Sequence, residues 1–249
     1  MSELPCQTQV WTDGDLHIVY DAACLSRPSS DWFLADSWPQ RSLLAAGRGK
    51  TWAIEGPFGA AVLRHYRRGG ALARLLRDQY LWTGLEASRP LREFRLLASA
   101  LNDGLPVPRP LAARIVRAGG FYSGDLIMSR IANASALSTR LAQPASWSEL
   151  DWGALGEVLG RAHALGYQHA DLNAHNILID TAGRYWLIDW DRGVRRRPGE
   201  WQERVLQRLQ RSLRKLYGGR VDQPDARQAW QCLLDTHARC ALSSGHART

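Results

Sequence analysis

The sequence predicts an α+β protein with two lobes, the first rich in β-strands and the second mainly helical. Short apolar runs separated by glycine-containing turns, which are typical of antiparallel strands, lie mostly in the first half of the 249 residues. One amphipathic helical pattern interrupts them, and three more follow in the second half. We expect residues 47–131 to form the first lobe and 132–249 the second. Residues 1–46 are expected to be an N-terminal extension that packs on the first lobe.

Composition places the chain among globular proteins. Hydrophobic residues make up 45% of the sequence, and no apolar run approaches the roughly 20 residues that a membrane-spanning helix needs. The first residues lack the basic and apolar regions of a secretory signal. The four cysteines (Cys6, Cys24, Cys232 and Cys240) lie far apart and show no metal-ligand spacing. We therefore expect a cytosolic protein with reduced thiols and no zinc site.

The formal net charge of +8 comes almost entirely from arginine, because Lys50 and Lys215 are the only lysines. The planar guanidinium binds phosphates and carboxylates with two parallel hydrogen bonds. A GC-rich genome would produce part of the same bias. The charge itself predicts an anionic partner, which from composition alone is a nucleic acid, a phospholipid surface or an acidic substrate.

A glycine-containing turn, Gly47-Arg48-Gly49, precedes two predicted strands at 51–55 and 60–66. It is not a Walker A loop, since that pattern would require a glycine where Leu44 stands. Two interpretations stay open for Gly47 and Gly49. They form either a plain hairpin turn or a turn whose backbone N–H groups cover the phosphates of a nucleotide.

Helical patterns flank the strands of both lobes. One helix is predicted from Pro90 to Gly104, and Glu93 lies beside its apolar stripe. In the second lobe, Ser148 is predicted to cap a helix that ends near Gly166. Two more helices are predicted at 200–217 and 225–242. The first of these is basic and amphipathic, which suits either packing in the core or contact with an anionic membrane.

The stretch from His169 to Asp191 carries the strongest chemical signal. Apolar runs at 177–179 and 186–188 flank a glycine-containing turn, which predicts a hairpin. This hairpin brings Asp189 back beside Asn176, and Asp171 lies only five positions before Asn176. Phosphoryl transfer needs one carboxylate to accept the proton of the attacking hydroxyl, and amide and carboxylate oxygens to hold divalent ions. The alternative is a surface hairpin whose acids are merely solvated.

The pattern H-x-D-L-x-x-x-N, followed by a strand and an aspartate, resembles the catalytic and metal loops of the protein-kinase-like superfamily. The resemblance implies a protein-kinase-like two-lobed fold, with Asp171 as the catalytic base and with Asn176 and Asp189 as Mg²⁺ ligands. Arg64 replaces the phosphate-binding lysine of that superfamily, and Glu93 is the expected ion-pair partner of Arg64. We expect His169 to be structural, bonding the backbone around the loop.

Further arginines lie near these motifs. Arg67 and Arg68 follow the second strand, and Arg192, Arg195, Arg196 and Arg197 follow Asp189. We expect them to bind the anionic groups of a substrate, although solvated loop positions would give the same pattern.

Three segments together resemble the lipopolysaccharide kinase family, and within it the kinases of 3-deoxy-D-manno-octulosonic acid (Kdo). They are VLRHYRRGG, then REFRLL with GLPVPRPLAA, then HADLNAHNILID with LIDWDRG. The resemblance covers about residues 47–197. It implies phosphorylation by ATP, with Mg²⁺, of the Kdo 4-hydroxyl on Kdo-lipid A. It also implies peripheral contact with the cytoplasmic face of an anionic inner membrane and no nucleic acid partner.

Other functions remain open at this stage. The chain has no A-P-E segment or long activation loop, which disfavours a conventional protein kinase. A heptose kinase, another small-molecule kinase or an atypical protein kinase of the same fold would share the motifs. A non-catalytic module that binds a nucleic acid or a lipid would explain the positive charge, but it would not require Asp171, Asn176 and Asp189 together.

Overall fold

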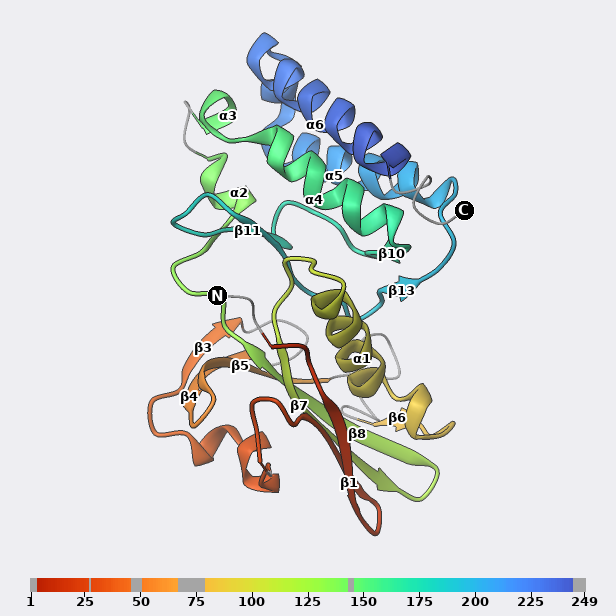
Figure 1. Cartoon of the computed structure of the whole chain (residues 1–249). Helices are drawn as coiled ribbons and strands as arrows, with labels where there is room; N and C mark the ends of the chain where they lie inside the picture. Colours follow the sequence, from red (N-terminus) through yellow and green to blue (C-terminus); the bar gives the residue numbers. More distant parts are fainter. Residues whose placement is uncertain (1–3, 27, 46–50, 67–78, 143–145, 244–249) are drawn as a thin grey trace. The chain divides into compact units, whose positions relative to one another are not determined.

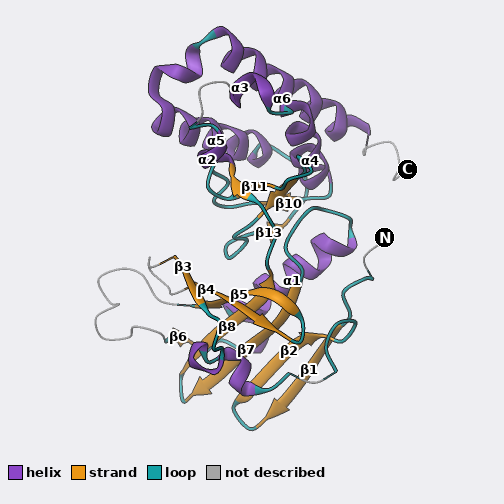
Figure 2. Ribbon diagram, turned by 90° about the vertical axis from the view of Figure 1, so that its left-hand side faces the viewer, coloured by secondary structure: helices purple, strands orange, loops and turns teal. Residues whose placement is uncertain are grey.

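The computed structural model of the chain contains two compact units, which are drawn in Figures 1 and 2. The first unit comprises Met1–Asn102 and Pro108–Arg130, and the second comprises Asp103–Val107 and Ile131–Thr249. Each unit has its own buried core. The structure describes residues 4–26, 28–45, 51–66, 79–142 and 146–243.

The first unit is built on one antiparallel sheet, in which the described strands follow the order β1-β2-β7-β8-β5-β4-β3, and β6 pairs with β8. The predicted strands at 51–55 and 60–66 are confirmed, with slightly different ends. The strands are β1 (Thr8–Asp13), β2 (Leu16–Asp21), β3 (Ser42–Ala45), β4 (Thr51–Gly56), β5 (Gly59–His65), β6 (Tyr80–Leu81), β7 (Pro110–Ala118) and β8 (Phe121–Ser129).

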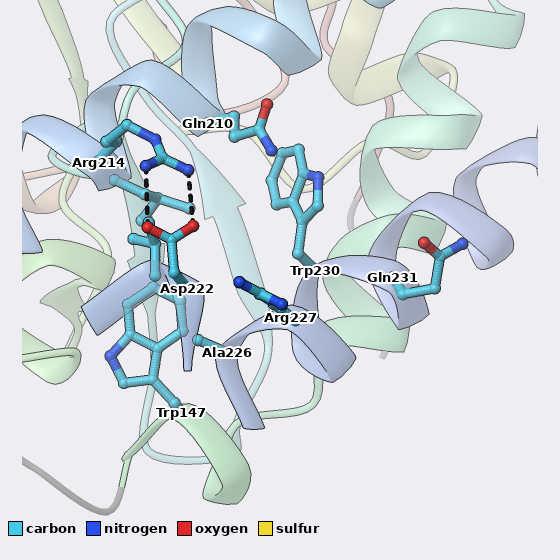
Figure 3. Close-up of a pocket in the computed structure, with 10 residues that line it drawn as sticks. Trp147, Gln210, Arg214, Asp222, Ala226, Arg227, Trp230 and Gln231 are labelled. Carbon is cyan, nitrogen blue, oxygen red and sulfur yellow. Dashed lines mark hydrogen bonds and ion pairs between the residues drawn. The ribbon is translucent and has the colours of Figure 1, made fainter. Parts of the chain in front are cut away.

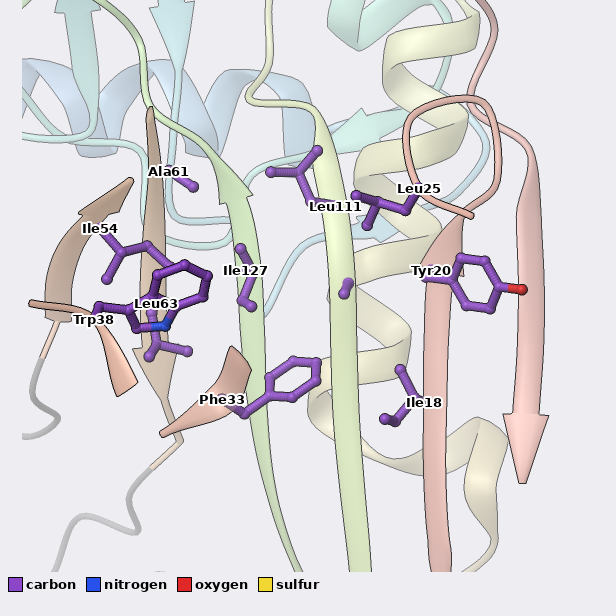
Figure 4. Close-up of a cluster of buried hydrophobic side chains, with 11 residues drawn as sticks. Ile18, Tyr20, Leu25, Phe33, Trp38, Ile54, Ala61, Leu63, Leu111 and Ile127 are labelled. Atoms are coloured by element: carbon purple, nitrogen blue, oxygen red, sulfur yellow. The ribbon is translucent and has the colours of Figure 1, made fainter. Parts of the chain in front are cut away.

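Strand register assigns the two faces of this sheet. Leu63 pairs with Ile127, and both belong to an apolar cluster on one face, where the 3-10 helix η1 (Ser30–Phe33) also contributes Phe33. Figure 4 shows this cluster, with α1 behind the strands. The next pair in register, Arg64 and Leu126, points to the opposite face because side chains alternate along a strand. Helix α1 (Arg89–Asn102) covers that face with Leu91, Phe94 and Leu97, all nearly inaccessible.

Residues before β3 form part of this sheet. β2 pairs with both β1 and β7, so it is an inner strand. Asp21, at the end of β2, is completely buried and accepts a hydrogen bond from the Arg109 side chain at 2.7 Å. A second 3-10 helix, η2 (Ala35–Ser37), follows η1. The segment is therefore part of the first unit, because it adds strands to the sheet and places Phe33 and Trp38 in the apolar cluster.

The second unit is mainly helical. It also contains two small antiparallel sheets, one of β9 (Ser135–Ala136), β11 (Ile177–Ile179) and β12 (Tyr185–Leu187), the other of β10 (Tyr167–Gln168) and β13 (Val194–Arg195). Its helices are α2 (Leu137–Arg140), α3 (Ser146–Glu149), α4 (Trp152–Ala164), α5 (Trp201–Tyr217), the 3-10 helix η5 (Gly218–Asp222) and α6 (Pro224–Ser243).

Helices α4 and α6 lie side by side because two glycines allow close approach. A Cβ at Gly156 would lie 2.4 Å from the main-chain oxygen of Leu233, and one at Gly160 would lie 2.7 Å from Cβ of Cys240. Glycine costs roughly 1 kcal/mol relative to alanine inside a helix. In return, the backbones of the two helices come into contact, and α6 lies alongside α4 (Figure 1).

The predicted cap of α4 is wrong. The side chain of Asp151, not Ser148, caps this helix by accepting a hydrogen bond from the N–H of Ala154 at 2.8 Å. Ser148 instead lies inside the short helix α3. Asp151 immediately precedes the first turn of α4, where a side-chain oxygen reaches the unpaired N–H groups.

Helix α5 uses its apolar stripe as core. Val205, Leu206, Leu209 and Leu213 are all buried, and Leu216 at the end of the stripe is exposed. Of the two fates predicted for this amphipathic helix, packing in the core is the one that the structure shows. Its basic residues face outward.

The structure bears on two further expectations. Cys6, Cys24, Cys232 and Cys240 form no disulfide in the structure, and reduced thiols stay a prediction. Across the described ranges, no helix has both the length and the apolar character needed to traverse a bilayer.

Candidate active site

His169 organises the loop between β10 and β11. Its ring is buried, its Nε2 donates to the main-chain oxygen of Ile188 at 2.8 Å, and its Nδ1 accepts the N–H of Asp171 at 3.2 Å. This pattern requires the neutral ring with the proton on Nε2. Burial lowers the pKa of His169, which keeps the ring neutral. The predicted structural role of His169 is confirmed, since the ring joins the Asp171 loop to the strand that precedes Asp189.

Two asparagine side chains fix the backbone at Asp171. Asn173 and Asn176 both donate their side-chain N–H to the main-chain oxygen of Asp171, at 2.8 and 2.9 Å. The Asn173 side-chain oxygen also accepts the N–H of His175 at 2.9 Å. Asn176 is 9% exposed. Its nitrogen is committed to the backbone, so its Oδ1 is the atom suited to bind a cation.

The predicted hairpin forms between β11 and β12 and carries the chain back to Asn176. Ile177 pairs with Leu187, and the N–H of Ile188 donates to the main-chain oxygen of Asn176 at 3.0 Å. Asp189 follows at once, with a left-handed φ of 64°. Such a conformation costs an L-residue roughly 1–2 kcal/mol and occurs preferentially at functional sites. Asp171 and Asp189 both act electrostatically on His169 and partly oppose the effect of its burial.

Asp180 closes the same hairpin. Its carboxylate is 6% exposed and accepts hydrogen bonds from the main-chain N–H groups of Ala182 and Arg184 at 2.9 and 3.0 Å. It also accepts one from the indole N–H of Trp186 at 3.0 Å. Sequence reasoning did not single out Asp180, although an aspartate directly before a Thr-Ala-Gly turn is a known turn signal.

Helix α5 docks on the Asp171 loop through two side chains one helical turn apart. Ser212 Oγ accepts the N–H of Ala174 at 3.2 Å. Arg208 donates from Nε to Asp171 Oδ1 at 2.9 Å, and its Nη2 donates to the same oxygen. Both side chains of this ion pair are 49% exposed. Sequence reasoning assigned no partner to Asp171 from α5, because 37 residues separate them.

In the first unit, Arg64 and Glu93 form the predicted ion pair. Arg64 Nη1 lies 3.3 Å from Glu93 Oε1, and the Tyr66 hydroxyl donates to Oε2 of the same carboxylate. The Glu93 side chain is completely buried, whereas that of Arg64 is 23% exposed. A buried carboxylate with two donors is fixed in place, so Arg64 is held while part of its guanidinium still reaches solvent.

The remaining predicted residues divide into two groups. Gly47, Gly49, Arg67 and Arg68 lie outside the described residues. Arg192 is exposed. Arg195 binds Asp103 at 3.1 Å and the main-chain oxygen of Leu165 at 3.2 Å, and Arg196 donates to the side chain of Gln168 at 3.2 Å. Arg195 and Arg196 therefore also hold β10 and β13 in place, and their role in substrate binding stays a prediction.

The helical unit also contains a pocket of about 410 Å³ between α3, α5, η5 and α6 (Figure 3). Trp147 and Trp230 line it, together with the Arg214–Asp222 ion pair. Asp171, Asn176 and Asp189 are not among its lining residues. The described residues also contain no group of three or more His, Cys, Asp or Glu that suits a metal ion. Any cation near Asp189 would therefore depend on Asn176, on water and on a bound substrate for its remaining ligands.

Comparison with known proteins gives consistent matches. Residues 40–237 match the profile of the lipopolysaccharide kinase (Kdo/WaaP) family. A 3-deoxy-D-manno-octulosonic acid kinase of Xanthomonas euvesicatoria pv. vesicatoria is 47% identical over 206 residues, which are 82% of this chain and 82% of that protein. The protein with the same description from Stenotrophomonas maltophilia is 46% identical over 209 residues, with 82% of each chain covered.

A solved structure shares the fold. WaaP, in a structure described as its complex with acyl carrier protein, superimposes with a TM-score of 0.53 over 90% of this chain and 95% of that one. The sequence identity is only 15%, so this likeness concerns the fold alone. With the antiparallel sheets and the helices described above, it confirms the predicted α+β, kinase-like fold.

Proposed function

The chain belongs to the lipopolysaccharide kinase (Kdo/WaaP) family, and we propose that it transfers the γ-phosphoryl group of ATP to the 4-hydroxyl of a Kdo residue on lipid A. It is thus a phosphotransferase of lipopolysaccharide core biosynthesis. The observation that carries the proposal is the loop in which His169 and Asn176 fix Asp171 next to the strand that leads to Asp189.

In the proposed mechanism, Asp171 is the general base. Its carboxylate accepts the proton of the sugar hydroxyl while the sugar oxygen forms a bond to the γ-phosphorus. The bond between that phosphorus and the bridging oxygen of ADP breaks, and ADP leaves with the electron pair. The proton then passes from Asp171 to solvent. The backbone of Asp171 is held by three side chains, so the base is positioned before the acceptor arrives.

Asn176 and Asp189 suit a divalent ion. Mg²⁺ prefers oxygen ligands, and in kinases it takes only one or two of them from protein carboxylates and others from phosphates and water. The Oδ1 of Asn176 and the carboxylate of Asp189 would hold it. When bound, such an ion neutralises charge on the phosphates of ATP. The left-handed backbone at Asp189 is the kind of strain that a ligand-binding position retains.

Arg64, held by Glu93, is proposed to bind the phosphates of ATP. An arginine in place of the superfamily lysine keeps the positive charge and offers two donors instead of a point charge. Glu93 binds this guanidinium, and the Tyr66 hydroxyl in turn donates to Glu93, all within the first unit. Gly47 and Gly49 are proposed to cover the phosphates. Arg67, Arg68, Arg192, Arg195 and Arg196 are proposed to contact anionic groups of the acceptor or of the membrane.

We further propose that the protein binds the cytoplasmic face of the inner membrane peripherally. Its net charge of +8 favours an anionic surface, and its acceptor would be a glycolipid anchored there. Since the apolar stripe of α5 is buried, contact would depend on exposed arginines rather than on insertion of that helix. No nucleic acid partner is proposed.

Mass spectrometry tests the proposal directly. The purified chain is incubated with Kdo-lipid A, ATP and Mg²⁺, and the product is fragmented to locate any added phosphate. A single phosphate on the Kdo ring, absent with Asp171→Asn, is the expected result. If phosphate is transferred to a heptose-containing acceptor but not to Kdo-lipid A, the acceptor sugar is heptose and not Kdo. Absence of transfer to either would contradict the proposed function.

A further inference from the structure

We propose that Arg208 recognises the carboxylate of the acceptor sugar, and that without acceptor the same guanidinium holds Asp171. This inference rests on the proposed function, since it takes Asp171 as the base and an octulosonic acid as the acceptor. It assigns to α5, which contributes no residue to the proposed catalytic set, the task of selecting an acidic sugar.

The other ion-paired arginines of α5 bind acids close to them in sequence. Arg204 binds Glu200, the residue just before α5 begins, at 3.1 Å, and Arg214 binds Asp222 in η5 at 2.9 Å. Arg208 instead crosses to the Asp171 loop and places Nε and Nη2 on one oxygen, Oδ1. Two donors on a single oxygen occupy the lone pairs that this oxygen would offer to an incoming hydroxyl proton.

The helix that carries Arg208 is fixed with respect to the loop. Ser212, one turn further along α5, accepts the N–H of Ala174 at 3.2 Å. Leu209 and Leu213 on the buried side of α5 are 0% and 2% exposed. The backbone of Arg208 therefore keeps its place beside Asp171, and only the arginine side chain needs to rotate for its partner to change.

Exchange of partner is energetically accessible. Both members of the Arg208–Asp171 pair are 49% exposed, and ion pairs this exposed contribute little to stability. The acceptor brings a carboxylate, which is the same chemical group that Arg208 already binds. A guanidinium binds a free carboxylate through two parallel hydrogen bonds, whereas here both of its donors converge on Oδ1. Binding of the acid would thus orient the sugar and release Oδ1 of Asp171 in one step.

The test compares Kdo-lipid A with an analogue in which the Kdo carboxylate is a carboxamide. We expect wild type to prefer the carboxylate in kcat/KM by about ten- to hundredfold, the effect of one charged hydrogen-bonded group. Arg208→Gln should remove this preference, mainly by raising the KM for the carboxylate acceptor, and should leave the KM for ATP unchanged. Arg208→Lys keeps the positive charge but lacks the planar guanidinium, so it should retain part of the preference for the carboxylate acceptor.

Arg204→Gln is the matched control, because it removes an exposed, paired arginine one turn away and should keep the wild-type preference. A wild-type preference in Arg208→Gln would overturn the inference. An equal loss on both acceptors would also overturn it, because Arg208 would then only position Asp171. These outcomes differ from failure of the proposed function, in which wild type phosphorylates neither acceptor. Thermal unfolding of each variant confirms that it is folded.

Discussion

Asn173 and Asn176 donate their side-chain amides to one acceptor, the main-chain oxygen of Asp171, at nearly equal distances of 2.8 and 2.9 Å. The two residues differ in their other contacts. Asn173 uses its side-chain oxygen to accept the N–H of His175. Asn176 instead accepts the N–H of Ile188 with its main-chain oxygen, which joins it to the strand that leads to Asp189. One residue therefore completes the turn of the loop, and the other is placed to offer an oxygen beside Asp189.

This difference predicts different responses to metal. Asn176→Ala should raise the Mg²⁺ concentration needed for half-maximal activity by tenfold or more, on the order of the loss of one oxygen ligand. Asn173→Ala removes an equivalent hydrogen bond to the same oxygen and should leave that concentration close to wild type. Activity is measured against total Mg²⁺ at fixed ATP. Equal shifts in the two variants would mean that Asn176 acts through the loop backbone alone.

Asp171→Asn tests the proposed base. The amide cannot accept the acceptor proton at neutral pH, so we expect kcat to fall by about 10²- to 10⁴-fold. Binding of ATP should persist, because Asp171 is not assigned to the nucleotide. The lost ion pair with Arg208 is half-exposed and should change thermal stability little. Glu149→Gln, an exposed acid of the same unit, serves as control. A turnover near wild type would remove Asp171 from the mechanism.

The sequence predicts the part of the site that is local in the chain. Alternating apolar runs around a glycine turn are sufficient for the β11–β12 hairpin, and a hairpin necessarily returns its second strand to its first. Asn176 and the residue preceding Asp189 therefore meet, as expected. His169 is also predictable, because a histidine between a strand and a loop with unpaired N–H and C=O groups readily bonds to both.

Contacts between distant segments were not predictable in the same way. Arg208 is one of several exposed arginines on α5, and only the packing of that helix selects it as the partner of Asp171. Asp21 and Arg109, 88 residues apart, likewise meet only because β2 pairs with β7. The strand β2 (Leu16–Asp21) is a short run of mostly apolar residues without regular alternation, and periodicity alone does not show that it lies inside a sheet.

Replacement of Glu93 tests how Arg64 is held. Its carboxylate is buried and binds both Arg64 and Tyr66, so Glu93→Gln leaves Arg64 without its fixed counter-charge. Glu93 is buried but Arg64 reaches solvent, so we expect a loss of about 1–3 kcal/mol and a lower unfolding temperature. If Arg64 binds the phosphates, the KM for ATP should also rise by about tenfold or more, which steady-state kinetics with varied ATP measures.

Glu86 provides the control for that variant. Glu86 and Arg95 form an ion pair of 2.7 Å in the same unit, but their side chains are 67% and 44% exposed. Glu86→Gln should therefore change neither stability nor the KM for ATP. Should Glu93→Gln lose stability while its KM for ATP stays at the wild-type value, the Arg64 pair would be purely structural.

Two buried histidines predict acid sensitivity of the helical unit. His163 on α4 and His237 on α6 lie 2.8 Å apart, from Nδ1 to Nε2, at the helix pair that the glycines bring together. Burial, reinforced by the neighbouring His237, lowers the pKa of His163 from 6.5 to about 3, and burial also lowers that of His237. Both rings are therefore neutral in the folded protein near neutral pH, and either one would be costly to protonate there.

The sign of the effect follows from proton binding. Between pH 6.5 and about 3 the unfolded chain binds a proton at His163 that the folded chain excludes, so stability is full above pH 6.5 and falls as the solution is acidified. The slope is about 1.4 kcal/mol per pH unit for one histidine, or about 2 kcal/mol between pH 7 and pH 5. Urea unfolding at several pH values should show this slope reduced in His163→Gln. His175→Gln, which removes an exposed histidine, should keep the wild-type slope. Parallel curves for wild type and His163→Gln would show that the buried pair does not control acid stability.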